Sequence, residues 1–161
     1  LDAVVQTPAA LIGVESKRFE PFRDAKTVNL SAAYDRPVWG DRMQAFERMR
    51  DHLRAGSEKF VHLDAAQPVE HAFGLVTEGR RRARRPVLFY LYAEPETRNG
   101  RPISQNDILR HRDEIARFGT AIAGDEVLFH SASYRDWIRS WHTSGDDVVA
   151  HGETILREFT P

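Results

Sequence analysis

Hydrophobic and polar residues follow two different periods along the chain. Near the start, β-prone residues fill positions 2–6 and 10–19, and Pro8 between them ends a strand easily. The short gap between the two stretches predicts a β-hairpin. Further on, apolar residues recur every three or four positions, the spacing of one helix face. This spacing predicts helices over 41–53, 64–82, 104–123, 133–141 and 146–159.

Two more segments are expected to be strands. The run VLFYLYA at 87–93 is almost continuously apolar, which is typical of a central strand buried on both faces, and a second strand is expected at 125–131. The long segment 20–38 is expected to be a loop. Strands that alternate with helices indicate an α/β sheet with helices against its faces. The 161 residues fit one domain, 1–161.

Local signals also indicate where two of the helices begin. Asp41 and Asp64 each precede a helical pattern and are suited to be N-caps, because a short carboxylate can accept hydrogen bonds from the first backbone amides. Gly56 follows the first helical pattern, where a left-handed residue ends a helix.

Composition removes several classes of function. The chain has no cysteine, so disulfides, thiolate metal sites and cysteine nucleophiles are excluded. We expect a cytoplasmic protein without a membrane partner, because no signal peptide is visible and no apolar stretch approaches the roughly 18 residues that span a bilayer. The net charge of −1 differs from the strongly basic charge of a nonspecific DNA coat protein.

The candidate chemistry lies in the first two strands. Glu15 and Lys17 are two positions apart in a strand, so their side chains project from the same face. The preceding residues are apolar, and a buried acid or lysine is costly unless it is paired or bound to a metal. A hairpin brings Asp2 toward Glu15. Two carboxylates beside a lysine suit phosphodiester hydrolysis, because carboxylates bind Mg²⁺ and the ammonium group can act on water or on the charged phosphate.

The spacing of Asp2 and Glu15-Ser16-Lys17 resembles the D-x(n)-E-x-K signature of the PD-(D/E)XK superfamily of restriction-endonuclease-like nucleases. The segment ESKRFEPF is similar to a bacterial branch with E-S-K-F-x-E-P at this place. The resemblance implies a mixed central sheet flanked by helices. It also implies that Asp2, Glu15 and the Ser16 carbonyl bind Mg²⁺, or Mn²⁺ instead, and that Lys17 assists the attacking water.

The chain departs from the superfamily pattern in two places. Leu1 stands where the pattern has proline, and the helix and strand that precede the Asp strand in the superfamily core are expected to be missing from this chain. The resemblance implies DNA as the first choice of partner. It also makes a homodimer one form to expect, since nucleases of this fold often pair to cut both strands.

Further residues are candidates for supporting roles. Gln67 and His71 lie four apart on one helix face, at the place of a Gln-x-x-x-Tyr pair in some exonuclease branches; Gln67 either reaches the site or belongs to a solvated polar face. Glu20 is a further candidate ligand for the metal or its water. Five arginines crowd a predicted helix end, where they either bind nucleic-acid phosphates or only complement the helix dipole. They are Arg80, Arg81, Arg82, Arg84 and Arg85.

The sequence therefore predicts a metal-dependent nuclease that hydrolyses DNA. Two alternatives stay open. The first is a nuclease-fold module that binds nucleic acid or protein without cutting. The second is an α/β protein of another class that binds a small molecule or a metal, in which Glu15 and Lys17 form only an ion pair.

Overall fold

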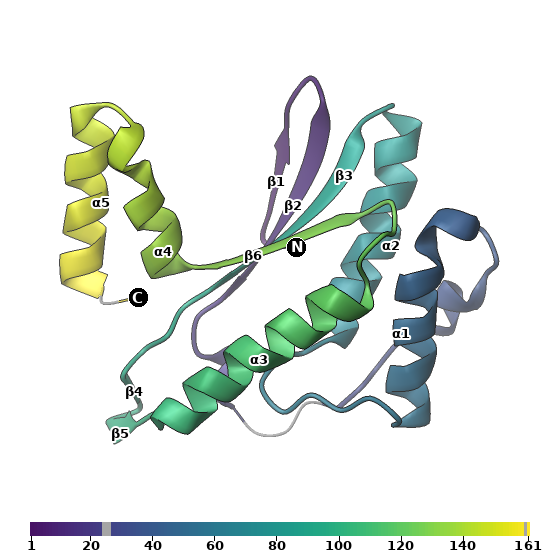
Figure 1. Cartoon of the computed structure of the whole chain (residues 1–161), viewed down its shortest axis with the longest axis horizontal. Coiled ribbons are helices and arrows are strands. Elements are labelled where there is room, and N and C mark those ends of the chain that lie inside the picture. The colour runs from purple at the N-terminus through teal and green to yellow at the C-terminus, as the bar shows by residue number, and fades with distance from the viewer. Residues whose placement is uncertain (24–26, 160) are drawn as a thin grey trace.

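A computed structural model of the chain describes residues 1–23, 27–159 and 161. Its centre is a four-stranded sheet in the order β1-β2-β3-β6 (Figure 1). The first pair of strands is antiparallel and the other two pairs are parallel, so the sheet is mixed. The strands are β1 (Ala3–Gln6), β2 (Ala10–Lys17), β3 (Arg85–Tyr92) and β6 (Leu128–Ser133). The α/β class predicted from the element order is thereby confirmed.

The predicted hairpin forms at the expected place. Thr7 closes its turn, because its backbone amide donates to the Ala10 carbonyl at 2.9 Å and its hydroxyl accepts from the Ala10 amide at 2.9 Å. Pro8 falls inside this turn, where the strand ladder has no need of its missing N–H. The turn therefore sets the register of β1 against β2, with Ala3 opposite Val14.

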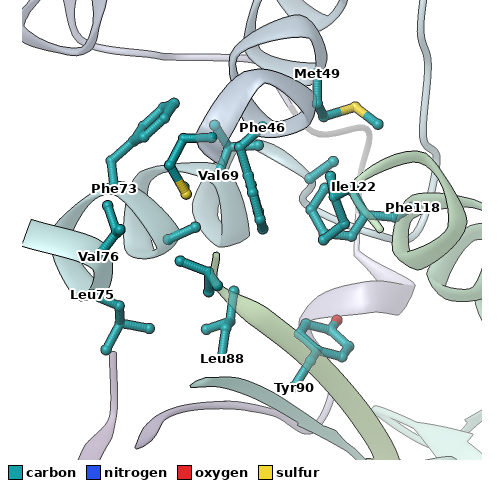
Figure 2. Packing of buried hydrophobic residues seen from close by; sticks show 14 of the residues in the cluster. Phe46, Met49, Val69, Phe73, Leu75, Val76, Leu88, Tyr90, Phe118 and Ile122 are labelled. Atoms are coloured by element: carbon teal, nitrogen blue, oxygen red, sulfur yellow. The ribbon is translucent and has the colours of Figure 1, made fainter. Parts of the chain in front are cut away.

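Three long helices cover the inner face of the sheet, the second and third directly and the first by packing against the second. They are α1 (Gln44–Ala55), α2 (Ala66–Arg81) and α3 (Gln105–Ala121). Their apolar stripes surround the side chains that β3 directs inward, with Phe46, Phe73 and Phe118 among the deepest residues (Figure 2). The helical spacing in the sequence arises from this shared core, because each helix buries only the face that it turns to the core.

The predicted N-caps are wrong. Asp41 lies in a 3₁₀ turn, Asp41–Met43, and α1 begins only at Gln44. The carboxylate that serves the start of α1 comes from Asp125, which accepts from the Phe46 amide at 2.9 Å. The α2 helix begins at Ala66 with no side-chain cap. Neither predicted carboxylate caps its helix, because tertiary packing places Asp125 at the start of α1 and no side-chain acceptor at the start of α2.

Other boundaries shift by a few residues. β6 begins at Leu128, three residues after the predicted start. Between β3 and α3 the chain forms a small hairpin of β4 (Thr97–Arg98) and β5 (Arg101–Pro102), which the predicted elements did not include. The predicted loop 20–38 holds the short 3₁₀ turns Glu20–Phe22 and Ala32–Asp35, while its positions 24–26 lie outside the described residues.

Two shorter helices form a separate layer. α4 (Tyr134–Arg139) and α5 (Asp146–Phe159) pack against each other and stand apart from the three long helices (Figure 1). Gly152 of α5 allows this packing, because a Cβ there would lie 3.0 Å from a methyl carbon of Ile138. Trp137 of α4 meets Phe89 on the outer face of the sheet, with ring centroids 6.2 Å apart. None of the helices in the described ranges combines the length and apolar character needed to cross a bilayer.

Candidate active site at the end of strand β2

The candidate site lies where β2 and β3 end side by side. Glu15 and Lys17 are opposite Tyr90 and Tyr92 in the parallel ladder, and both project toward the helices. Glu15 is only 3% exposed. As the strand alternation predicts, the carboxylate and the ammonium group share one face, and Lys17 Nζ lies 2.6 Å from Glu15 Oε1. The strand thus carries an ionised pair into the edge of the core.

A third residue completes this cluster. His71, from the middle of α2, places Nε2 at 2.9 Å from Glu15 Oε2. The backbone nitrogen of Leu1 also lies 3.4 Å from Oε2. Each carboxylate oxygen of Glu15 therefore has a positively charged or hydrogen-bonding nitrogen beside it. The chain meets the cost of burying an acid by placing the Lys17 ammonium group of the same strand and the His71 imidazole of α2 beside the carboxylate.

The pairing decides the charge state of Glu15. Burial raises the pKa of the carboxyl, but hydrogen bonds from His71 and Lys17 and the positive charges of both outweigh burial and lower the pKa to about 2. Glu15 is therefore an anion throughout the physiological range. A carboxylate that is already ionised can bind a cation without first losing a proton.

Gln67 and His71 lie one turn apart on α2 and face the same end of the sheet. His71 contacts Glu15, whereas Gln67 lines a pocket of about 180 Å³ whose wall also includes Lys17. In the sequence, His71 was visible only as the residue that replaces tyrosine in a Gln-x-x-x-Tyr pair. That spacing was the signal for its contact with the site.

Asp2 lies on the opposite side of Ser16 from β3. Its Oδ2 accepts from the Ser16 amide at 2.7 Å, and its own amide donates to the Val14 carbonyl at 2.9 Å. The carboxylate thus stands where the backbone carbonyl of a longer β1 would be. The N–H and C=O of one strand residue face the same neighbour, so the Ser16 carbonyl also points to the Asp2 side. The Ser16 hydroxyl lies 2.6 Å from the Tyr134 hydroxyl of α4.

Asp2, Glu15 and the Ser16 carbonyl lie at the same end of the β1–β2 hairpin, where Asp2 accepts from the Ser16 amide and Glu15 is turned toward α2. Within the described ranges, no three His, Cys, Asp or Glu side chains are close enough to hold an ion by themselves. Mg²⁺ needs no such cage, since it binds one or two carboxylates and keeps several waters. The donor set therefore fits Mg²⁺ or Mn²⁺ in chemistry, with water completing the ligands, and does not fit a metal that requires several imidazole or thiolate ligands.

Glu20 has a local structural role. Its Oε2 accepts from the backbone amides of Arg18 and Phe19, each at 2.9 Å, and so turns the chain sharply after β2. Burial raises the pKa of Glu20, but these backbone hydrogen bonds and the nearby Lys17 lower it overall. Glu20 nevertheless lines the same pocket as Gln67 and Lys17. It borders the site and is held in place by the loop that it forms.

The predicted arginine cluster lies away from this site. Arg80, Arg81 and Arg82 are at the C-terminal end of α2, whereas Gln67 is in its first turn. The helix rise of 1.5 Å per residue separates the two ends by roughly 20 Å. Arg84 follows the helix. Arg85 begins β3 beside Ala10, whereas Lys17 lies at the other end of the strand pair, beside Tyr92. The structure therefore does not bring the cluster together with the candidate site.

Most charges of that cluster are already paired. Arg80 reaches Glu126 at 2.8 Å, and Arg81 and Arg82 both bind Glu78. Glu78 precedes the two arginines by three and four positions, the spacing at which helix side chains meet, so its local sequence already indicated these ion pairs. Structural ion pairs account for much of the positive charge that suggested phosphate binding.

Comparisons of the chain with protein-family models, with curated proteins and with solved structures find no match.

Proposed function

We propose that the protein is a metal-dependent nuclease that hydrolyses phosphodiester bonds, with DNA as the first substrate to test and a restriction-endonuclease-like arrangement of its core. One observation carries the proposal. Glu15 and Lys17 meet at 2.6 Å at the end of a buried strand, beside a pocket, with Asp2 at the end of the paired strand. The D-x(n)-E-x-K resemblance and the observed β-β-α-α-β-α-β order of the main elements both favour this interpretation.

Each residue has a definite task in this proposal. Asp2, Glu15 and the Ser16 carbonyl would hold the ion, which would supply positive charge beside the phosphate and lower the pKa of a bound water. Lys17 directs its ammonium group to the attacking water or to the charge that develops on the phosphate. His71 acts through Glu15, since its Nε2 lies 2.9 Å from Oε2 and holds the carboxylate in place. Gln67 offers its amide to the same pocket.

The test is a cleavage assay on plasmid and linear DNA with Mg²⁺, with Mn²⁺, and with a chelator. We expect cleavage that requires the ion and disappears in Lys17→Ala. The matched control is Arg81→Ala, which removes one positive charge from the far end of α2, where Arg81 pairs with Glu78. Equal cleavage by Lys17→Ala and the unmodified chain would overturn the proposal.

The second candidate function is a nuclease-fold module that binds nucleic acid or protein without cutting. The pairing of Glu15 favours it, because Lys17 Nζ lies 2.6 Å from one carboxylate oxygen and His71 Nε2 lies 2.9 Å from the other. A catalytic ion must therefore compete with two positively charged or hydrogen-bonding groups for one ligand. Binding to an oligonucleotide that persists with Mg²⁺ or Mn²⁺, without any product, would decide for this alternative.

A further inference from the structure

Beside the candidate site lies a second cluster of arginines that sequence reasoning did not identify. We define the arginine groove by Arg23, Arg98 and Arg101. These residues line two adjoining cavities, one of about 600 Å³ that all three border and one of about 350 Å³ that Arg23 and Arg98 border with Phe19 and Asn99. We propose that this groove binds the phosphate backbone of a polynucleotide strand and leads the strand to Lys17. The proposal rests on the proposed function.

The β4–β5 hairpin places two arginines of the groove side by side. Arg98 and Arg101 are directly opposite each other in the ladder. Asn99 and Gly100 between them have φ values of 51° and 74°, so both central residues of the turn are left-handed, as in the tight turns that join two strands. Like charges at opposite positions destabilise a strand pair. A bound anion between or above them removes this repulsion.

The positive charge of the groove is not neutralised by its own surroundings. Arg23 and Arg101 make no ion pair with any carboxylate of the described residues, and the Arg98 guanidinium donates to the Phe22 carbonyl at 2.6 Å. Asp107, the acidic residue that lines the larger cavity, is engaged by the Ser104 hydroxyl at 2.8 Å and lies 3.4 Å from His62 Nε2. The groove thus differs from the 80–82 cluster, whose charges are paired.

The groove and the candidate site are continuous. Arg23 and His62 line both the larger cavity and the site pocket that contains Lys17 and Gln67. His62 is 7% exposed, and its Nδ1 donates to the Pro21 carbonyl at 3.0 Å, which fixes the ring at the boundary. A strand that lies along the arginines therefore arrives at the ammonium group of Lys17, where the proposed cleavage takes place.

The size and composition of the groove favour a polymer over a single phosphate. Its cations come from the hairpin and from the segment after β2, and two of them, Arg23 and Arg98, border both cavities. Phe19 lines the smaller cavity, and the Arg18 guanidinium lies 5.0 Å from the centre of its ring. Aromatic rings and arginine planes beside a positively charged track are the features on which bases of a nucleic acid stack.

The test measures binding separately from cleavage. A fluorescent oligonucleotide is titrated with the full chain in a chelator, so that no product forms, at several salt concentrations. Arg98→Ala/Arg101→Ala should weaken binding about tenfold for each arginine removed. The slope of log affinity against log salt should become shallower by roughly 1.4 to 1.8. The matched control, Arg81→Ala/Arg82→Ala, removes the same charge from α2 and should bind like the unmodified chain.

A second variant protects the result against misfolding. Arg98 holds the Phe22 carbonyl, so its loss can disturb the loop, whereas Arg101 is exposed. Arg101→Glu should therefore weaken binding with an unchanged circular dichroism spectrum, and Arg98→Lys should keep most of the affinity. No binding by the unmodified chain, or equal losses in the α2 control, would overturn the proposal.

The outcomes also separate this inference from the proposed function. Binding that depends on Arg98 and Arg101, without cleavage in Mg²⁺ or Mn²⁺, supports the groove and removes the nuclease. Cleavage that is unchanged in Arg98→Ala/Arg101→Ala supports the nuclease and removes the groove.

Discussion

The ion pairs of Glu15 make a quantitative prediction about stability and pH. In the folded protein the pKa of Glu15 is lowered from 4.5 to about 2. Each tenfold change in proton affinity corresponds to about 1.4 kcal/mol, so ionised Glu15 contributes ~3 kcal/mol to the free energy of unfolding. Because the folded pKa is the lower one, this contribution is complete above pH 4.5 and is lost as the pH falls toward 2.

The assay compares the unmodified chain with Glu15→Gln. Urea unfolding followed by circular dichroism gives the free energy of unfolding of both proteins at a series of pH values between 6 and 2. The difference between them should be largest at the upper end and should shrink by ~3 kcal/mol as Glu15 becomes protonated. Other carboxyl groups titrate in both proteins and cancel in the difference.

Glu78→Gln is the matched control. Hydrogen bonds from Arg81 and Arg82 also lower the pKa of Glu78 to about 2, but these groups lie at the helix surface, where solvent screens ion pairs. Its difference from the unmodified chain should change much less with pH. If Glu15→Gln and the unmodified chain lose stability in parallel down to pH 2, the cluster around Glu15 does not hold its charge as described.

Three more predictions follow from single contacts. Lys17→Ala should lower cleavage about 100-fold or more while oligonucleotide binding stays within a few-fold, and a loss of binding equal to the loss of cleavage would contradict its role. Glu114→Ala should lower the free energy of unfolding, measured in urea, by about 3 kcal/mol or more, because the buried carboxylate accepts hydrogen bonds from three backbone amides at 2.8–2.9 Å. A loss under about 1 kcal/mol would show that other groups replace these hydrogen bonds. Gly79→Ala should destabilise α2 by about 1–3 kcal/mol, since a Cβ there lies 2.8 Å from a backbone oxygen, whereas Gly74→Ala, which meets nothing within 4 Å, should stabilise it by up to about 1 kcal/mol. Thermal unfolding of both glycine variants checks the pair, and equal shifts in Tm would refute the packing argument.

Local sequence patterns predicted most of the secondary structure. The apolar run of β3 and the stripes of α1, α2 and α3 were legible because the burial of one face imposes a period on the sequence itself. The same alternation predicts that Glu15 and Lys17 share one face, and their side chains meet there at 2.6 Å. The turn at Pro8 was equally local, since it depends on residues within a few positions of one another.

The small hairpin is a local signal that was missed. Asn99-Gly100 is the dipeptide that favours left-handed turn residues, and the structure has the tight turn there. Its flanking strands, β4 and β5, are only two residues long, so they carry no alternation to support it. The sequence pattern instead suggested phosphate contacts at the arginines of 80–85, although Glu78 lies three and four positions before Arg81 and Arg82 and pairs with both.

Local sequence patterns are enough to predict the main strands and helices and the side chains that share a face, because these features depend on residues a few positions apart. Contacts between distant segments depend on how the elements pack: His71 beside Glu15, Asp125 at the start of α1, and Arg98 beside the segment after β2. The physical reason is that a helix can cross a sheet at many angles and offsets while burying the same stripe. Which polar groups then meet at its ends is set by the packing of the whole core.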